Sequence, residues 1–238
     1  MNFIKTTLVS TLLAISPVTL AGLIDFEDYA SGTIIDNEYY VSDGITFNGI
    51  NIAKNAENLA VLFDTNNYTG GDRDLAAPFF NNDNLGEISP GNVLIIHEHP
   101  DECDAFTCVD PDDEGSRPAA YFSINFSEAV TLNSIDFFDV ESEEYGTSEN
   151  NLISFFDSNN VEILPNTFYT PNTGGDNQWA RLDFGVSGVS SIKISLYGSG
   201  AIDNINYTKV PEPTTLAIFA LGIIGLASRR SLLAKKKL

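Results

Sequence analysis

Carboxylate and amide side chains occur in pairs at three places along the chain. They are Asp25 and Glu27 near the start, Asp72 and Asp74 in a glycine-rich stretch, and Asp203 and Asn204 near the end. Calcium binds six to eight oxygen atoms from carboxylates, amides and backbone carbonyls, and it tolerates irregular geometry. We therefore expect a calcium site to draw on these residues.

None of the acidic segments fits the loop of an EF-hand calcium site. The nearest approximation begins at Asp64, but Tyr68 takes the fifth position of that loop and Leu75 the twelfth. A single aspartate can equally form a turn or lie on a solvated surface. The calcium expectation therefore applies to the group of carboxylates and not to each one.

Histidine and cysteine gather in one further segment. His97 and His99 are followed by Cys103 and Cys108, the only two cysteines in the chain. In an oxidising compartment two cysteines at this spacing are expected to form a disulfide. The alternative is a zinc site made of the two histidines and the two cysteines, although four intervening residues are more than zinc motifs normally have. We expect the disulfide.

The candidates for an aromatic face that binds sugar are Trp179, Tyr39, Tyr40, Tyr68 and Tyr145. Trp179 is singled out because it follows a polar turn at the start of a predicted strand. The alternative is that this tryptophan packs in the core, as aromatic residues of β-sandwiches commonly do. The sequence contains no Gly-x-Ser-x-Gly elbow, phosphate-binding loop or dinucleotide fingerprint. We therefore expect a protein that is not an enzyme.

Composition limits the partners of the chain. The 238 residues carry 33 acidic and 12 basic side chains, a formal net charge of −21. Residues 22–209 hold 32 of the acidic and 6 of the basic residues, a net charge of −26. So negative a domain repels phosphate backbones, which argues against a nucleic-acid partner. The hydrophobic content of 43% is enough for a folded core.

The elements that must position these residues are strands. Alternating or continuous apolar runs occupy residues 23–27, 44–47, 59–63, 93–96, 120–126, 132–137, 179–184 and 189–197. Clusters of Asn, Asp, Gly and Ser separate them, and no internal segment has a clear helical period. We predict one all-β domain, a β-sandwich, over residues 22–209. Two long loops, at residues 64–91 and 98–118, are expected to be functional or held in place by other contacts.

The N-terminal segment has the pattern of a secretory signal peptide. Lys5 precedes a short apolar run, which ends in small and polar residues before Ala21. We expect residues 1–21 to be removed, so that the mature chain begins at Gly22. The protein would then be exported through the inner membrane.

The C-terminal segment has three parts in a fixed order. A Pro-Glu-Pro motif at Pro211, Glu212 and Pro213 is followed by an uncharged apolar run from residue 216 to 227, and then by Arg229 and Arg230. A short transmembrane helix with its basic end in the cytoplasm would explain this order. Residues 210–238 are therefore expected to form a separate C-terminal segment, after the signal peptide at 1–21 and the domain at 22–209.

This tail resembles the PEP-CTERM sorting signal of exported bacterial proteins. The resemblance implies that an exosortase in the membrane recognises the tail and cuts near Pro211, Glu212 and Pro213. The protein would be anchored transiently and then become attached to the cell surface or be released, often among extracellular polysaccharide. One departure from the pattern is the additional segment from Ser231 to Leu238, with its three lysines.

The body of the chain resembles the ectodomains of many PEP-CTERM proteins, which are similar to jelly-roll and galactose-binding-like modules. The residues that carry this resemblance are Ile24 to Glu27 at the start of the domain and Gly198 to Ile205 at its end. The segments from Gly71 to Leu75 and from Gly91 to Ile96 add to it. In such modules, carboxylates of the first and last strands often meet over a structural calcium ion. The resemblance points to Glu27 and Asp203 as ligands, with Asp72 and Asp74 as weaker candidates.

These observations together predict an exported, exosortase-sorted protein of the cell surface or extracellular matrix. Its jelly-roll-like β-sandwich would be a non-catalytic, calcium-supported module that binds carbohydrate or matrix. One alternative is an acidic matrix component with a purely structural role. The other is a hydrolase of extracellular polysaccharide, which would need two carboxylates across a cleft.

Overall fold

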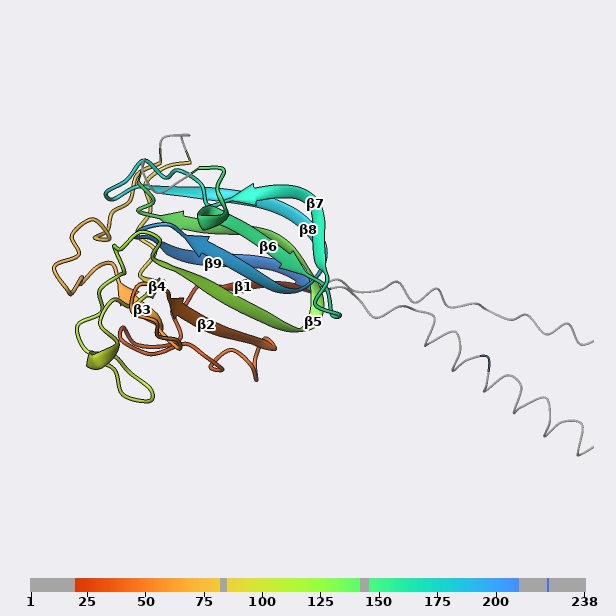
Figure 1. The fold of residues 1–238 in the computed structure, drawn as a ribbon, viewed down its shortest axis with the longest axis horizontal. Coiled ribbons are helices and arrows are strands. Elements are labelled where there is room, and N and C mark those ends of the chain that lie inside the picture. Colours follow the sequence, from red (N-terminus) through yellow and green to blue (C-terminus); the bar gives the residue numbers. More distant parts are fainter. Residues whose placement is uncertain (1–19, 82–84, 142–145, 210–221, 223–238) are drawn as a thin grey trace, which may run out of the picture. The chain divides into compact units, whose positions relative to one another are not determined.

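A computed structural model of the chain describes residues 20–81, 85–141, 146–209 and 222. Almost all regular structure in these residues is β-strand (Figure 1). The strands are β1 (Leu20–Ile24), β2 (Ile45–Asn51), β3 (Ala60–Asp64), β4 (Asn92–Ile96), β5 (Ala120–Phe138), β6 (Leu152–Phe156), β7 (Glu162–Tyr169), β8 (Trp179–Leu196) and β9 (Ala201–Lys209). Two short 3-10 turns, η1 (Pro100–Glu102) and η2 (Glu149–Asn151), lie in the loops.

The strands form one antiparallel sheet in the order β3-β4-β9-β5-β8-β6-β7, with β1 paired to β9 and β2 paired to β5. Strands β5 and β8 are long, and each half of β5 has a different neighbour. The first half of β5 pairs with β2, and the second half pairs with β9. Strands that change partners in this way at a bend make the corners of β-sandwiches.

The bends have local causes in the sequence. The register between β5 and β8 shifts between Asn125 and Val130, and again after Leu132. On the β8 side, Gly185 and Gly188 have φ angles of +65° and +80°, which side chains other than glycine rarely adopt. The sequence patterns at 120–126 and 132–137 are therefore two halves of one bent strand, and the same holds for 179–184 and 189–197. The predicted all-β, jelly-roll-like sandwich is confirmed.

The main core lies between the layers of the bent sheet. It contains buried aliphatic and aromatic residues from β1, β2, β3, β4, β5, β6, β8 and β9 in one continuous cluster. Strand β2 follows the expected alternation, with every second residue buried from Ile45 to Asn51. Alternation places one face of such a strand on the core and leaves the other face to water or a loop.

Strands β3 and β4 differ, because they are buried on both faces. A second cluster packs Val61 and Phe63 of β3 and Val93 and Ile95 of β4 beneath Phe79 and other loop residues. The two long loops that follow β3 and β4 therefore cover the outer face of these strands. This packing holds the loops in place and explains the continuous apolar runs in both strands.

The two ends of the described domain lie side by side. Strand β1 pairs with β9 so that Leu20 is opposite Lys209 and Ala21 is opposite Thr208. The predicted cleavage position after Ala21 therefore falls within β1. Residues 1–19 and the sorting-motif residues Pro211, Glu212, Pro213, Arg229 and Arg230 lie outside the described residues. Among the residues that are described, no helix is long and apolar enough to cross a membrane.

Candidate cation site

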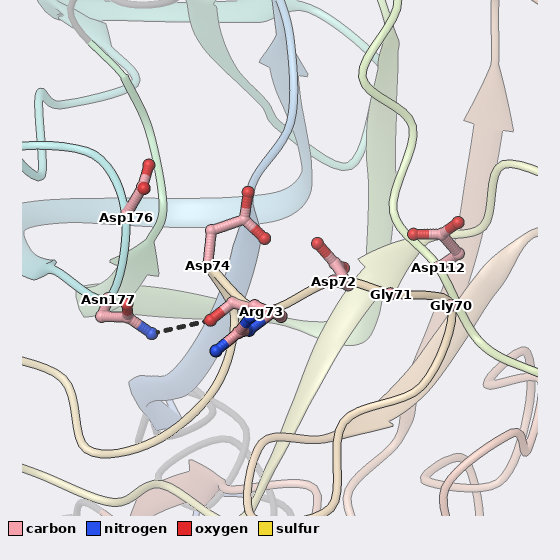
Figure 2. Close-up of a pocket in the computed structure, with 8 residues that line it drawn as sticks. All are labelled: Gly70, Gly71, Asp72, Arg73, Asp74, Asp112, Asp176 and Asn177. Atoms are coloured by element: carbon pink, nitrogen blue, oxygen red, sulfur yellow. Dashed lines mark hydrogen bonds between the residues drawn. The ribbon is translucent and has the colours of Figure 1, made fainter.

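An acidic pocket forms where three loops meet at the start of β9. The loop after β3 contributes Asp72 and Asp74, the loop after β4 contributes Asp112 and Asp113, and the loop before β8 contributes Asp176. Figure 2 shows carboxylates of these loops facing a common space of about 420 Å³. The pocket is therefore built from segments that are far apart in the sequence.

Local backbone contacts fix the first two loops against each other. Gly70 and Gly71 have φ angles of +64° and +86°, so the chain makes a tight turn that other residues would strain. The N–H of Gly70 donates to Asp110 Oδ1 at 2.9 Å. The hydroxyl of Thr69 donates to the carbonyl oxygen of Pro111 at 2.8 Å. These bonds place Asp72 beside the aspartates that follow Pro111.

The inner group of ligands consists of Asp72, Asp112 and Asp113, with one carboxylate oxygen of each within 4.8 Å of the others. Asp113 is 7% exposed, and its Oδ2 accepts a hydrogen bond from the N–H of Gly200 at 2.6 Å. Asp72 is 9% exposed, and its Oδ2 is buried without a hydrogen-bond partner. A buried carboxylate oxygen that accepts no hydrogen bond is costly unless a cation lies beside it.

An outer group consists of Asp74, Asp139 and Asp176, again with ligand oxygens within 4.8 Å of one another. Asn177 orients this side of the pocket, because its side-chain N–H group donates to the carbonyl oxygens of Arg73 at 3.0 Å and Ala76 at 2.6 Å. The first of these bonds is drawn in Figure 2. Two members of each group line the pocket: Asp72 and Asp112 of the inner group, and Asp74 and Asp176 of the outer group.

Proton affinity in the inner group is strongly raised. Burial, reinforced by the neighbouring Asp113, raises the pKa of Asp72. Burial likewise raises the pKa of Asp113, although the N–H of Gly200 opposes the shift. Burial and the charge of Glu98 raise the pKa of Asp112 to about 6. Without a cation, protonation of these carboxylates is favoured, because it removes the repulsion between their negative charges.

The chemistry of this donor set fits a hard divalent cation. All of its side-chain ligands are carboxylate oxygens, which suit calcium or magnesium better than a transition metal. The loops carry backbone carbonyls that could add further oxygens, and calcium accepts irregular arrangements of this kind. The inner group is the stronger candidate, because Asp72 is buried with an oxygen that accepts no hydrogen bond.

The four expected calcium ligands occupy two different places. Asp72 and Asp74 line the pocket, whereas Glu27 and Asp203 belong to no group of three ligands among the described residues. Glu27 Oε1 accepts a hydrogen bond from the N–H of Asn92 at 2.6 Å. Asp203 lies on β9 opposite Asp136 of β5. The candidate site therefore lies in the long loops, at Asp72 and Asp74, and not between the first and last strands, where Glu27 and Asp203 had been expected to meet.

Asp203 nevertheless has an unusual environment. It is 1% exposed, and its Oδ1 has no hydrogen-bond partner, while its Oδ2 accepts from Asn204 at 3.0 Å. Burial and the nearby charge of Asp136 raise the pKa of Asp203 to about 9, and Asp25 and Glu27 add to the shift. Asp136 itself makes a two-pronged ion pair with Arg181, at 2.6 and 2.8 Å.

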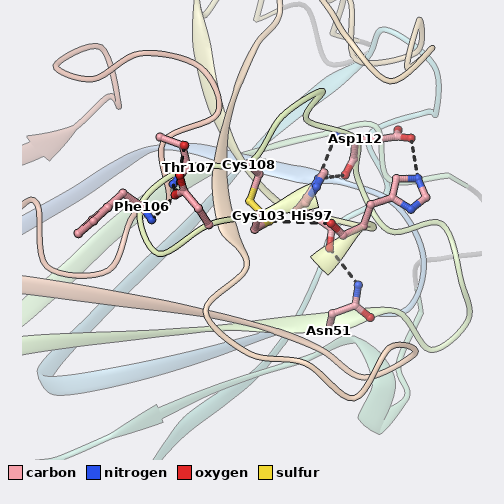
Figure 3. The surroundings of a disulfide bond; sticks show 9 residues. Asn51, His97, Cys103, Phe106, Thr107, Cys108 and Asp112 are labelled. Carbon is pink, nitrogen blue, oxygen red and sulfur yellow. Dashed lines mark hydrogen bonds and ion pairs between the residues drawn. A yellow bond between two sulfur atoms is a disulfide. The ribbon is translucent and has the colours of Figure 1, made fainter. Parts of the chain in front are cut away.

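The disulfide and His97 lie near Asp112 in the region after β4 (Figure 3). Cys103 and Cys108 are joined, with an S–S distance of 2.04 Å. Because both sulfurs are in this bond, they are not thiolate ligands, and the geometry agrees with the disulfide rather than with the zinc alternative. His97 is fully buried, and its Nδ1 lies 3.1 Å from the carbonyl oxygen of Asp112. Burial lowers the pKa of His97.

The expectation that Trp179 could serve as a ligand platform is wrong. Trp179 is 3% exposed and packs in the second hydrophobic cluster, and its Nε1 donates to the carbonyl oxygen of Gly86 at 3.1 Å. The loop after β3 covers the ring. The tryptophan therefore stabilises that loop from below and presents no face to a sugar.

Four residues of the two carboxylate groups were not predicted individually: Asp112, Asp113, Asp139 and Asp176. The signal available was the acidic run after Pro111 and the Gly-Gly-Asp-Asn sequence at residues 174–177, in loops rich in Asp, Asn and Gly. Which of these many aspartates meet depends on how the loops fold over β3 and β4. That information is not contained in any local pattern.

Comparison with known proteins identifies the tail. A family model described as the PEP-CTERM protein-sorting motif matches residues 209–231. The chain therefore carries this sorting motif at its C-terminus, as its Pro-Glu-Pro, apolar and arginine segments predicted. The motif indicates export and sorting to the cell surface. No curated protein matches the chain as a whole.

Three solved structures show weak likeness to the body of the chain. A Streptococcus pneumoniae fucose binding module has 16% identity and a TM-score of 0.25, over 40% of this chain and 66% of that one. The lectin binding domain of Lectinolysin, complexed with Lewis b, has 10% identity and a TM-score of 0.25, over 41% and 68%. Discoidin II from Dictyostelium discoideum has 11% identity and a TM-score of 0.31, over 69% and 59%. Scores this low carry no argument about ligand.

Proposed function

We propose that the protein is an exported, exosortase-sorted surface protein whose β-sandwich is a non-catalytic, calcium-supported module that binds extracellular polysaccharide. The observation that carries this proposal is the inner group of the acidic pocket, in which Asp72 is buried with an oxygen that accepts no hydrogen bond. A calcium ion bound by Asp72, Asp112 and Asp113 would offset most of the negative charge of the group and hold the two long loops together.

The lining of the pocket supports a hydroxyl-rich ligand. Beside its carboxylates, the pocket is lined by Arg73 and by the amide of Asn177. These groups offer donors and acceptors of the kind that sugar hydroxyls use. A bound calcium ion with open coordination positions would also accept hydroxyl oxygens. The net charge of −26 on residues 22–209 disfavours anionic polymers and favours neutral ones.

A direct test uses the mature chain, from Gly22 onward, on a panel of immobilised polysaccharides with calcium or with chelator. We expect retention on at least one polymer in calcium and loss of retention in chelator or in the Asp72→Asn variant. Retention on none of the polymers would favour the structural matrix role. Release of reducing ends that a single carboxylate-to-amide substitution abolishes would favour a hydrolase.

A further inference from the structure

The domain has two chemically different ends, which β9 connects. At the start of β9, Gly200 holds Asp113 of the acidic pocket. At its end, Lys209 pairs with Leu20 of β1, so the first and the last described residues of the domain lie side by side. Strands β1 and β9 can be followed to this end in Figure 1. Nine residues of extended strand separate the two ends by about 27 Å. The acidic pocket thus lies far from the point where the sorting tail continues.

At the end of the domain near Lys209, a turn held by hydrogen bonds exposes apolar side chains. Tyr39 is 3% exposed and packs against Phe26 and Phe47, and its carbonyl oxygen accepts N–H groups of Asp43 and Gly44 at 2.9 and 3.1 Å. The next two residues, Tyr40 and Val41, are 55% and 95% exposed. The turn therefore holds two apolar side chains out toward solvent at fixed positions.

These side chains lie next to the last residue of the domain. Tyr40, Val41 and Lys209 line one shallow pocket of about 190 Å³. Asp43 and Glu128 line it too, and Asp43 accepts a hydrogen bond from the hydroxyl of Tyr207 at 3.0 Å. The surface thus combines exposed apolar groups with charges of both signs. Tyrosine is enriched at membrane–water interfaces, where its amphipathic ring lies at the level of the headgroups.

The length of the tail limits how far this surface can lie from a bilayer. Six residues, 210–215, separate Lys209 from the apolar run that begins at Leu216. Even fully extended, this connection spans at most about 25 Å. In the anchored state, which belongs to the proposed function, the end of the domain carrying Tyr40 and Val41 is therefore held close to the membrane surface.

We propose that Tyr40 and Val41 form a membrane-contact surface that rests in the headgroup region of the bilayer while the tail is anchored. The partner is a zwitterionic lipid surface, because a domain with a net charge of −26 is repelled by anionic lipid. Weak affinity is sufficient, because the tail keeps the local lipid concentration high. In this orientation the acidic pocket opens away from the membrane, toward polymer in the surrounding medium.

The test uses the mature chain in phosphatidylcholine vesicles, with a fluorophore on a single added cysteine. Ser42→Cys places the label beside Tyr40 and Val41, Tyr68→Cys places it in a loop at the pocket end, and Gly222→Cys places it in the tail. We expect a nitroxide on the lipid headgroup to quench the label at position 42 and not the label at position 68. Replacing both Tyr40 and Val41 by serine should reduce quenching at position 42 to the level at position 68. The melting temperature should not change, because both side chains are exposed.

Each remaining outcome has a distinct meaning. Quenching of the label at position 222 by a nitroxide on the acyl chain would show that the tail is anchored. If the labels at positions 42 and 68 are then quenched equally, the contact surface is overturned and the anchored state is not. Unchanged quenching at position 42 in the double serine variant would overturn the role of Tyr40 and Val41. No quenching at position 222 would refute the anchored state, and the contact surface with it.

Discussion

Asp113 Oδ2 lies 2.6 Å from the backbone nitrogen of Gly200, which donates a hydrogen bond to it across 87 positions of sequence. This bond ties the loop after β4 to the residue just before β9, which lies between β4 and β5 in the sheet. Because Asp72 of the loop after β3 lies against Asp113, both long loops converge on one strand end. A cation in this position would link the two long loops, whose carboxylates repel one another when they are ionised.

Removing one carboxylate should abolish most of the stabilisation by calcium. Because its raised pKa keeps the Asp72 carboxyl group protonated in the absence of a cation, we expect Asp72→Asn to melt close to the native chain in chelator. In calcium at a hundred times its Kd, the native chain should gain about 2.7 kcal/mol, and the variant should gain little. Differential scanning calorimetry with and without calcium measures both effects.

The control for this substitution is Asp101→Asn, which removes a charge of the same kind from an exposed position in η1. It should leave the calcium response unchanged. If the native chain melts at the same temperature in calcium and in chelator, the inner group does not bind calcium.

The pH dependence of stability should change sign with calcium. In the folded protein without a cation, the pKa of Asp112 is raised from 3.8 to about 6, and those of Asp72 and Asp113 are raised as well. The folded state then binds more protons than the unfolded chain between pH 3.8 and about 6, so stability should fall as pH rises through this window. Calcium competes with these protons and should make stability rise with pH instead.

Melting temperatures measured across this window, in chelator and in calcium, test the prediction. The lowered pKa of His97 has the opposite effect, since folding opposes its protonation as the pH falls. For this reason the informative quantity is the difference between the two conditions. If the plots of melting temperature against pH are parallel in calcium and in chelator, the groups with raised pKa values do not bind the ion.

Sequence patterns predicted the strands well because burial on one or both faces leaves a local signature. The alternation at residues 120–126 and the apolar run at 93–96 both became strands. The joining of two predicted strands into β5 was not foreseen, because the bend after Asn125 has polar residues that look like a turn. Strand β7 was missed as well, and it contains Pro165.

The pocket was predicted only in part, and the reason is physical. Asp72 and Asp74 are recognisable because glycines next to them allow a tight turn. Asp139 lies at the end of β5 with a φ angle of +55°, a conformation that local sequence does not specify. Trp179 was open to two interpretations, because its burial depends on a loop that packs over it from about a hundred residues earlier in the chain.

Close approach between β2 and β3 should make Gly49 intolerant of a side chain. A Cβ atom at this position would lie 2.3 Å from the backbone nitrogen of Ala60 and 2.7 Å from the carbonyl carbon of Leu59. Backbone atoms cannot move aside as a flexible side chain can, so we expect Gly49→Ala to destabilise the fold by about 1–3 kcal/mol. Urea denaturation measures the change in free energy of unfolding.

Gly115→Ala is the matched control, because nothing lies within 4 Å of a Cβ atom at that position. It should change the free energy of unfolding by less than about 0.5 kcal/mol. Similar destabilisation by the two substitutions would mean that glycine flexibility, and not the contact with Ala60, determines the effect at Gly49.

The disulfide between Cys103 and Cys108 should contribute modestly to stability and more strongly to the shape of its loop. The bond closes a short loop, with a sequence separation of 5, for which chain entropy gives about 2 kcal/mol. Within the loop, the N–H groups of Phe106 and Thr107 donate to Asp104 Oδ1 at 2.7 and 2.8 Å.

Replacing both cysteines by serine should therefore lower the free energy of unfolding by about 2 kcal/mol, as measured by urea denaturation. Calcium affinity should change little, because the candidate ligands Asp72 and Asp113 are held by other contacts, such as the hydrogen bond from Gly200 to Asp113. Titration calorimetry on the double variant separates the two effects. If the double variant no longer binds calcium, the disulfide is needed to position Asp112 and Asp113, and the other contacts of the loop are not sufficient.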